Sequence, residues 1–178
     1  MKNLFTLFSI LLLSVLTFIS CQEKDYSTEI NPILEKYLKA WNEGTLEILD
    51  EITAPDFELR INPDFEAKIG RDKLKESITN TKTAFPDFLV TVDKELFISD
   101  TALVIHWTIA GTNTGKGINP PTGNKTQSKG FSVIFFADGK LTGEWIGYSD
   151  LTWVMQMGFT ISPPAAETDK IKKEKETL

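Results

Sequence analysis

The chain has 178 residues, a formal net charge of −6, one histidine and one cysteine. Its acidic balance, without a basic stripe, argues against nucleic acid as a partner and disfavours adhesion of the bare domain to anionic lipid. One cysteine cannot form an internal disulfide, and one histidine excludes a histidine-based metal cluster. We therefore expect no metal and no cofactor.

The first 28 residues predict export and a lipid anchor. Lys2 precedes an apolar stretch over residues 4–19 that is short for a membrane span and typical of a signal peptide. Ser20 and Cys21 resemble a bacterial lipoprotein box, in which the cysteine becomes the acylated N-terminus. We expect loss of residues 1–20, a tether over 21–28 and anchoring in the cell envelope, with the outer membrane favoured. An ordinary signal peptide with an incidental cysteine is the alternative.

Residues 29–160 are predicted to form one domain that begins with helices. Apolar residues recur at helical spacing over 29–43, and Pro32 favours a start near Asn31. Gly44 ends this helix, Thr45 caps a short second one, and Pro55 stops it. A short strand over 57–61 and a helix over about 71–83 follow.

The second half of the domain is predicted to be a sheet. Residues 89–98, 101–113, 129–137 and 140–148 alternate between apolar and more polar positions, and Asp138-Gly139 joins the last two as a hairpin. A short helix closes the domain. The order predicts an α+β fold whose curved sheet carries helices on one face and leaves a concave side open to a ligand. Residues 161–178, charged and containing prolines, are predicted to be a disordered tail.

An ordered set of short motifs runs through this sheet region. The motifs are Phe85-Pro86-Asp87-Phe88, Trp107-Thr108, Gly111-Thr112, Pro120-Pro121-Thr122-Gly123, Phe136-Ala137-Asp138-Gly139-Lys140, Glu144-Trp145 and Gln156-Met157-Gly158. Together they resemble the SnoaL-like polyketide cyclase or ester cyclase group of the nuclear transport factor 2-like superfamily, over about residues 30–159. The resemblance implies a cone in which a curved mixed or antiparallel sheet and about three helices enclose one hydrophobic pocket, often in a homodimer.

The same resemblance implies where an acid/base group would lie. In cyclase members an aspartate four residues after the tryptophan exchanges a proton with a polyketide during an aldol ring closure. The fourth residue after Trp145 is Ser149, and Asp150 follows it. Since neighbours on a strand point to opposite faces, Asp150 would replace the aspartate only if a bulge or the strand end re-aimed it. Asn113 stands where the family has histidine, and His106 where arginine is frequent.

These positions give a set of candidate site residues, each with a structural alternative. The candidates for catalysis are Asp150 and His106, and those for ligand binding are Trp41, Trp107, Asn113, Trp145 and Ser149. Asp150 is also a favoured N-cap for the last helix, and His106 is alternatively a structural or partly exposed histidine. The tryptophans are alternatively ordinary core residues.

Three functions remain open from the sequence. The first is binding or carriage of a small hydrophobic molecule without chemistry. The second is a cyclase or isomerase type of enzyme, in which Asp150, helped by His106, moves a proton next to a carbonyl while Asn113 or Ser149 holds the oxyanion. The third is an interaction role, in which the open sheet face packs against a partner or a second copy. An Asp150 side chain in solvent, or one capping residues 151–156, would count against the enzyme.

Overall fold

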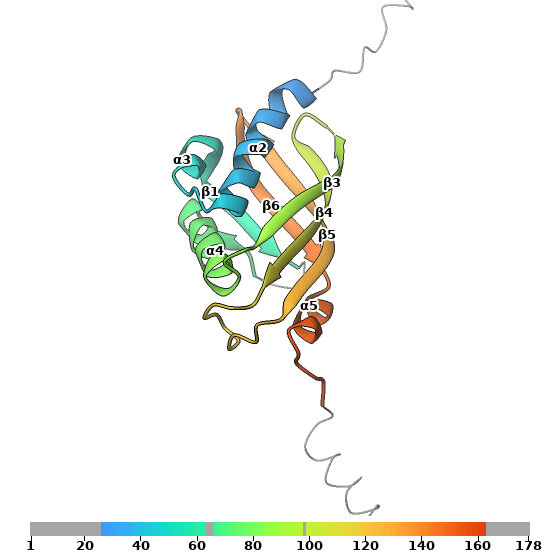
Figure 1. Cartoon of the computed structure of the whole chain (residues 1–178). Helices are drawn as coiled ribbons and strands as arrows, with labels where there is room; N and C mark the ends of the chain where they lie inside the picture. Colours follow the sequence, from blue (N-terminus) through green and yellow to red (C-terminus); the bar gives the residue numbers. More distant parts are fainter. Residues whose placement is uncertain (1–25, 63–65, 98, 163–178) are drawn as a thin grey trace, which may run out of the picture.

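A six-stranded sheet and four helices make up the part of the chain that the computed structural model describes, residues 26–62, 66–97 and 99–162 (Figure 1). The α+β class expected from the sequence is confirmed. In chain order the elements are α2 (Ser27–Glu43), α3 (Ile48–Ile52), β1 (Thr53–Ile61), β2 (Lys68–Ile69), α4 (Arg71–Ala84), β3 (Leu89–Phe97), β4 (Ala102–Thr112), β5 (Lys125–Ala137), β6 (Lys140–Tyr148) and α5 (Asp150–Gln156).

The sheet has the strand order β2-β1-β6-β5-β4-β3. Strands β3 to β6 pair antiparallel, and their alternating sequences bury one face, as with Leu103, Ile105 and Trp107 on β4. Strand β1 joins the sheet through a parallel pairing with β6, and β2 pairs antiparallel with β1. Neither the parallel pairing nor the two-residue strand β2 follows from the alternation of the sequence.

Helix α2 lies across the buried face of the sheet (Figure 1). It begins at Ser27, one turn before the start near Asn31 that Pro32 predicts, so Pro32 lies inside the helix and cannot donate its backbone bond. The packing of Tyr26 against the core and the burial of Ile30 stabilise this extra turn. The helix ends as expected, with Gly44 at φ 75° and its N–H donating to the Ala40 carbonyl at 3.0 Å.

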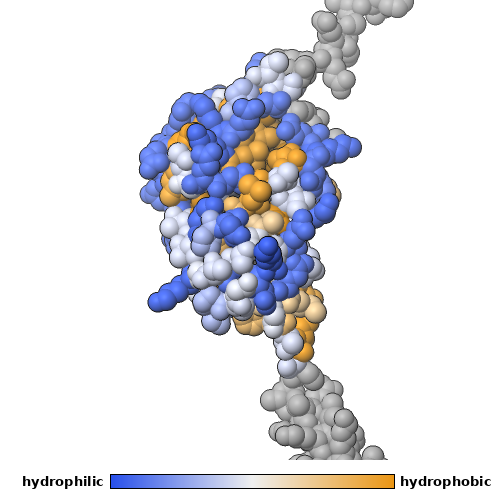
Figure 2. Space-filling view, viewed as in Figure 1, coloured by the Kyte–Doolittle hydropathy of each residue, from blue (hydrophilic) through white to orange (hydrophobic). Residues whose placement is uncertain are grey.

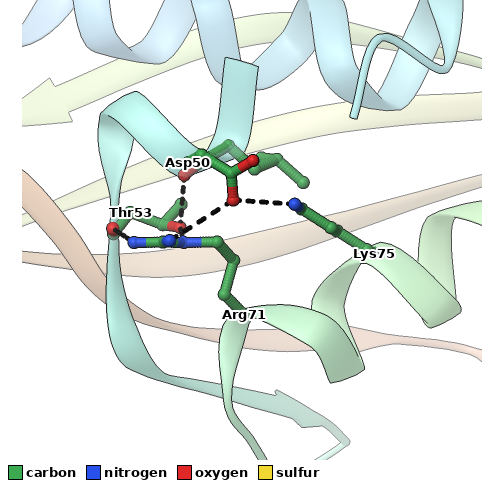
Figure 3. A network of polar contacts seen from close by, with 5 residues as sticks. Asp50, Thr53, Arg71 and Lys75 are labelled. Atoms are coloured by element: carbon green, nitrogen blue, oxygen red, sulfur yellow. Dashed lines mark hydrogen bonds and ion pairs between the residues drawn. The ribbon is translucent and has the colours of Figure 1, made fainter. Parts of the chain in front are cut away.

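A polar network outside the pocket joins α3 to α4 (Figure 3). The Asp50 carboxylate accepts from Lys75 Nζ at 2.7 Å and from Arg71 Nη1 at 3.3 Å, and the hydrogen bond from Lys75 lowers the pKa of Asp50. Arg71 also donates from Nε to Thr53 Oγ1 at 2.9 Å and from Nη2 to the Thr53 carbonyl. The network fixes the start of α4 against the turn between α3 and β1. Thr45 does not cap α3, which begins at Ile48 after Glu47.

The predictions for the two ends of the chain fall mostly outside the described residues. Cys21, the signal peptide over residues 1–20 and the tail from 163 onward lie there. Ser27 and Thr28, the last residues of the predicted tether, belong to α2. Within residues 26–62, 66–97 and 99–162, no helix is long and apolar enough to cross a membrane.

Candidate functional site

A pocket of about 730 Å³ lies between the buried face of the sheet and the helices α2, α4 and α5. This volume is within the range of small-molecule sites. Its walls are largely aromatic and aliphatic, with Trp41, Phe85, Phe88, Ile105, Trp107, Ile109, Ile146, Trp153 and Met157 among the lining side chains. The cone is therefore hollow. A filled core would have excluded both the ligand-binding and the enzyme hypotheses, and these two remain open.

The mouth of the pocket is formed by the loop after β4 and by α4 and α5. Exposed residues at this rim include Asn80, Lys116 and Ile118, whose side chain is fully exposed. Asn113 fixes the start of the loop, since its side-chain oxygen accepts from the Thr122 backbone N–H at 3.0 Å and from the Thr122 hydroxyl at 3.2 Å. The side chain of Asn113 is 1% exposed and is used in holding the loop.

Hydrophobic surface gathers over α5 beside this mouth (Figure 2). Leu151 and Met155 are each 52% exposed, while Trp153 on the opposite side of the helix is buried against Phe85 and Phe88. The helix therefore presents one apolar side to the pocket and another to solvent.

The deep end of the pocket carries a buried polar cluster. The Glu144 side chain, on β6, accepts from the Tyr37 hydroxyl at 2.6 Å and from the Ser132 hydroxyl. Trp107 Nε1 donates to Ser132 Oγ at 2.8 Å, and the Trp41 indole donates to the Tyr37 hydroxyl. Two hydroxyl groups, from α2 and β5, therefore bond to one carboxyl group, and two indoles, from α2 and β4, bond to those hydroxyls.

Gly130 makes this cluster geometrically feasible. It lies directly opposite Trp107 in the antiparallel pairing of β4 and β5, and both residues face the pocket. Because Gly130 has no side chain, the indole of Trp107 lies across β5 and reaches Ser132, the next inward residue of that strand. A Cβ at position 130 would lie 2.6 Å from Trp107 Cζ2 and 2.5 Å from the Gly147 carbonyl oxygen.

Burial dominates the electrostatics of the cluster. Glu144 is 4% exposed, and its cross-strand neighbours Leu59 and Ile134 are fully buried. Removal from water raises the pKa of the Glu144 carboxyl, and the hydrogen bonds from Ser132 and Tyr37 oppose this only in part. Burial, followed by the neighbouring Glu144, raises the pKa of the Tyr37 hydroxyl well above its ordinary value.

A second polar group lies at the other end of β6, where the strand meets α5. The Asp150 carboxyl lines the pocket and accepts from the Asn62 side-chain amide and from the Tyr148 hydroxyl. Asn62 directly follows β1 and has φ 56°. Its backbone N–H donates to the Ile146 carbonyl at 2.7 Å, and its side-chain oxygen accepts from the Tyr148 backbone N–H at 3.2 Å. Burial, then Asp150, raises the pKa of the Tyr148 hydroxyl.

The structure brings four of the predicted site residues to the pocket. Trp41, Trp107, Asn113 and Asp150 all line it. The N-cap of α5 is Ser149, whose hydroxyl accepts from the Thr152 N–H, so Asp150 does not cap the helix or point to solvent. The feature set out above as evidence against an enzyme is absent at Asp150.

Three predicted site residues lie outside the pocket lining. His106 is on the opposite face of β4, with Nδ1 3.2 Å from the Asp93 carboxylate and its ring 4.9 Å from that of Phe131. Trp145 is 49% exposed on the outer face of β6, where its indole donates to Glu58 at 3.2 Å. Ser149 is used as the helix cap. The placement of these three side chains in the pocket is therefore wrong.

A β-bulge explains the error at Trp145 and Ser149. Phe136 pairs with Leu141 but Phe135 pairs with Gly143, so β6 carries one extra residue, Thr142. After this bulge the even-numbered residues from Glu144 to Asp150 face the pocket. A count that starts from Trp145 therefore begins on the wrong face, and Asp150 needs no second bulge to reach the site.

Sequence reasoning missed the other polar residues of the two clusters around Glu144 and Asp150. These are Tyr37, Asn62, Ser132, Glu144 and Tyr148. The signal for Glu144 was its place on a strand otherwise rich in apolar residues, but its face depends on the bulge. Tyr37 is one of the residues at helical spacing over 29–43, which accounts for the burial of its ring but not for the hydrogen bond of its hydroxyl. The described residues contain no group of three His, Cys, Asp or Glu side chains suited to a metal ion.

Comparison with known proteins identifies relatives of this architecture. The family model of the SnoaL-like polyketide cyclases matches residues 31–157. TsrD from Streptomyces laurentii is 23% identical with a TM-score of 0.66, over 76% of this chain and 98% of that one. Wild-type IdmH from Streptomyces antibioticus is 24% identical with a TM-score of 0.61, over 72% and 98%.

A protein from Jannaschia sp. CCS1, provisionally described as a SnoaL-like polyketide cyclase, is 17% identical with a TM-score of 0.66, over 82% of this chain and all of that one. At these identities the solved structures show a common fold. The comparison with curated proteins gives no significant match.

Proposed function

Because the chain belongs to the SnoaL-like polyketide cyclase family, we propose that it binds a small hydrophobic carbonyl compound and moves a proton on it, with Asp150 as the acid/base group. The observation that carries this proposal is the position of Asp150 on the pocket lining at the junction of β6 and α5. The apolar walls favour a ligand with few polar groups.

The surroundings of Asp150 suit a group that accepts a proton. Asn62 and Tyr148 both direct donors at the carboxyl, which orients it and leaves it as a hydrogen-bond acceptor. Asn62 is itself held by two backbone bonds to β6, so it acts as a positioning residue. A fixed carboxylate on the wall of a largely apolar pocket is well suited to proton transfer.

The reaction class follows from this arrangement. Asp150 takes a proton from a carbon next to a carbonyl, and the C–H electron pair moves to form the enolate. In a ring closure the enolate carbon bonds to a second carbonyl carbon, and Asp150 returns its proton to the resulting alkoxide oxygen. In an isomerisation the proton returns to a different carbon of the same molecule.

The test uses 2-tetralone, an apolar ketone with exchangeable protons next to its carbonyl. In D₂O we expect the protein to accelerate deuterium incorporation, followed by NMR, and Asp150→Asn to reduce the acceleration at least about 100-fold. His106→Gln, on the outer face of β4, is the control and should retain it. A protein that binds 2-tetralone but gives no acceleration would favour carriage without chemistry.

We also propose that the domain works in the bacterial cell envelope, attached through lipid on Cys21. The apolar stretch over residues 4–19 and the Ser20-Cys21 pair support this proposal. A hydrophobic ligand partitions into membranes, so an anchor would keep the pocket close to its source.

A further inference from the structure

We infer that Glu144 is a specificity-determining residue that donates a hydrogen bond from a neutral carboxylic acid to a carbonyl oxygen at the deep end of the ligand. The inference deepens the proposed function, since it takes the same pocket as the ligand site. It assigns the substrate class as an elongated apolar compound with an oxygen acceptor at the end away from Asp150.

The first support is the absence of a compensating cation. The ion pairs of the described residues lie at the surface, and none of them includes Glu144. Lys68 lines the same pocket, but its ammonium group donates to Ser77 at 3.1 Å. A carboxyl group that is 4% exposed and lacks a cation is most stable in its neutral form.

The second support is the direction of the hydrogen bonds. Indole N–H groups can only donate, so the Trp107 and Trp41 bonds occupy acceptor sites on Ser132 and Tyr37. The hydroxyl protons remain available, and Tyr37 donates to the Glu144 carboxyl at 2.6 Å while Ser132 donates to the same group. With both hydroxyls already donating to it, the acid proton of Glu144 is left for a partner in the cavity. The raised pKa of Glu144 agrees with this arrangement.

The third support is the spacing of the two acids along β6. Asp150 is six positions after Glu144, and the four steps that lie within β6 place the Cα atoms of Glu144 and Tyr148 roughly 13 Å apart at about 3.3 Å per residue, with Asp150 two positions beyond. This is too far for both side chains to act on one carbonyl group. Glu144 therefore does not stabilise the enolate formed at Asp150, and it instead holds a second oxygen of a long ligand.

The experiment compares two probes of equal shape, 2-acetylnaphthalene and 2-isopropylnaphthalene, by titration of tryptophan fluorescence. We expect the protein to prefer the ketone by about tenfold, and Glu144→Leu to abolish this preference. Glu144→Gln, which keeps a donor, should retain part of it and covers the case in which the leucine variant does not fold. Equal preferences in the protein and in both variants would overturn the inference.

The protonation state is read separately by infrared spectroscopy. We expect a neutral carboxyl band at neutral pH that is missing in Glu144→Gln, and a bound 2-acetylnaphthalene carbonyl stretch that is lower in the protein than in Glu144→Leu. Absence of that carboxyl band, or tighter binding of 2-naphthylmethylamine than of the ketone, would instead assign an ionised Glu144 and overturn the inference.

Asp150→Asn separates this inference from the proposed function. That variant should lose the deuterium exchange on 2-tetralone and keep the preference for 2-acetylnaphthalene. If exchange is absent from the protein itself but the preference depends on Glu144, the acid/base role fails and the deep-end contact stands. If exchange depends on Asp150 and the preference does not depend on Glu144, the reverse holds.

Discussion

Gly130 is a position at which the smallest possible substitution should have a large effect on stability. In Gly130→Ala the new methyl group would lie 2.6 Å from Trp107 Cζ2, closer still to Cη2, and 2.5 Å from the Gly147 carbonyl oxygen. Overpacking of this kind costs about 1–3 kcal/mol. The indole can move away only by giving up its 2.8 Å hydrogen bond to Ser132, which adds about 1 kcal/mol.

The expected loss in the free energy of unfolding is therefore about 2–4 kcal/mol. For a domain of this size, a change of 1 kcal/mol shifts the melting temperature by roughly 4 °C, so thermal unfolding followed by circular dichroism should show a decrease of roughly 8–16 °C. Because Trp107 and Ser132 support the deep end of the pocket, the preference for 2-acetylnaphthalene should also fall in this variant.

Gly147→Ala is the matched control on the neighbouring strand. A Cβ at position 147 meets nothing within 4 Å, and the backbone there is not in the left-handed region. The alanine should therefore be neutral or stabilise the protein by up to about 1 kcal/mol, through the unfolded chain. Equal melting temperatures for the two variants would refute the claim that Gly130 is required by the close approach of Trp107.

Three further predictions concern separate parts of the molecule. Because the pKa of Glu144 is raised, the folded state holds a proton that the unfolded state releases above pH 4.5. The free energy of unfolding, measured by urea titration relative to Glu144→Gln, should therefore fall as pH rises from 4.5 through the folded pKa, by at most about 1.4 kcal/mol per pH unit. Parallel pH curves for the two proteins would contradict this. Cys21→Ser should lose acyl label and membrane fractionation, and a variant still found with membranes would count against the anchor. The homodimer implied by the family resemblance should use the outer face of the sheet, where Phe131 is 57% and Trp145 49% exposed. Phe131→Asp should therefore shift sedimentation toward the monomer. A wild-type protein that stays monomeric at high concentration would exclude this dimer.

The strands were predictable because each one buries a single face. The alternation over residues 89–98, 101–113 and 140–148 corresponds to β3, β4 and β6, and the Asp138-Gly139 turn joins β5 to β6, with both residues at positive φ. The start of α2 was less predictable, since a local rule about Pro32 competes with the tertiary burial of Ile30. Helix ends depend on such contacts, which a sequence pattern does not contain.

The residues of the site could be predicted only where the residue type and its position in the family pattern suffice, without knowledge of the face on which the side chain lies. Trp41, Trp107 and Asp150 were placed in the pocket, because a cone of this family has one hollow and these residues border it. The predicted placement of His106 and Trp145 in the pocket was wrong, since the face that a strand residue occupies depends on its register, which the residue type does not give. Tyr37 and Glu144 are brought together by a contact across 107 positions, which no local pattern predicts.

The bulge at Thr142 sets which face of β6 meets the ligand, because it absorbs one extra residue. If β6 kept its length but lost the bulge, regular alternation would run from Leu141 through Gly143 to Trp145, which would turn the indole of Trp145 inward and the Glu144 carboxyl outward. Deletion of Thr142 would instead remove the extra residue together with the bulge, so Gly143 and Glu144 would keep their partners Phe135 and Ile134 and the same residues would line the pocket. Among relatives, a gap opposite this position should accordingly leave the residues that meet the ligand unchanged.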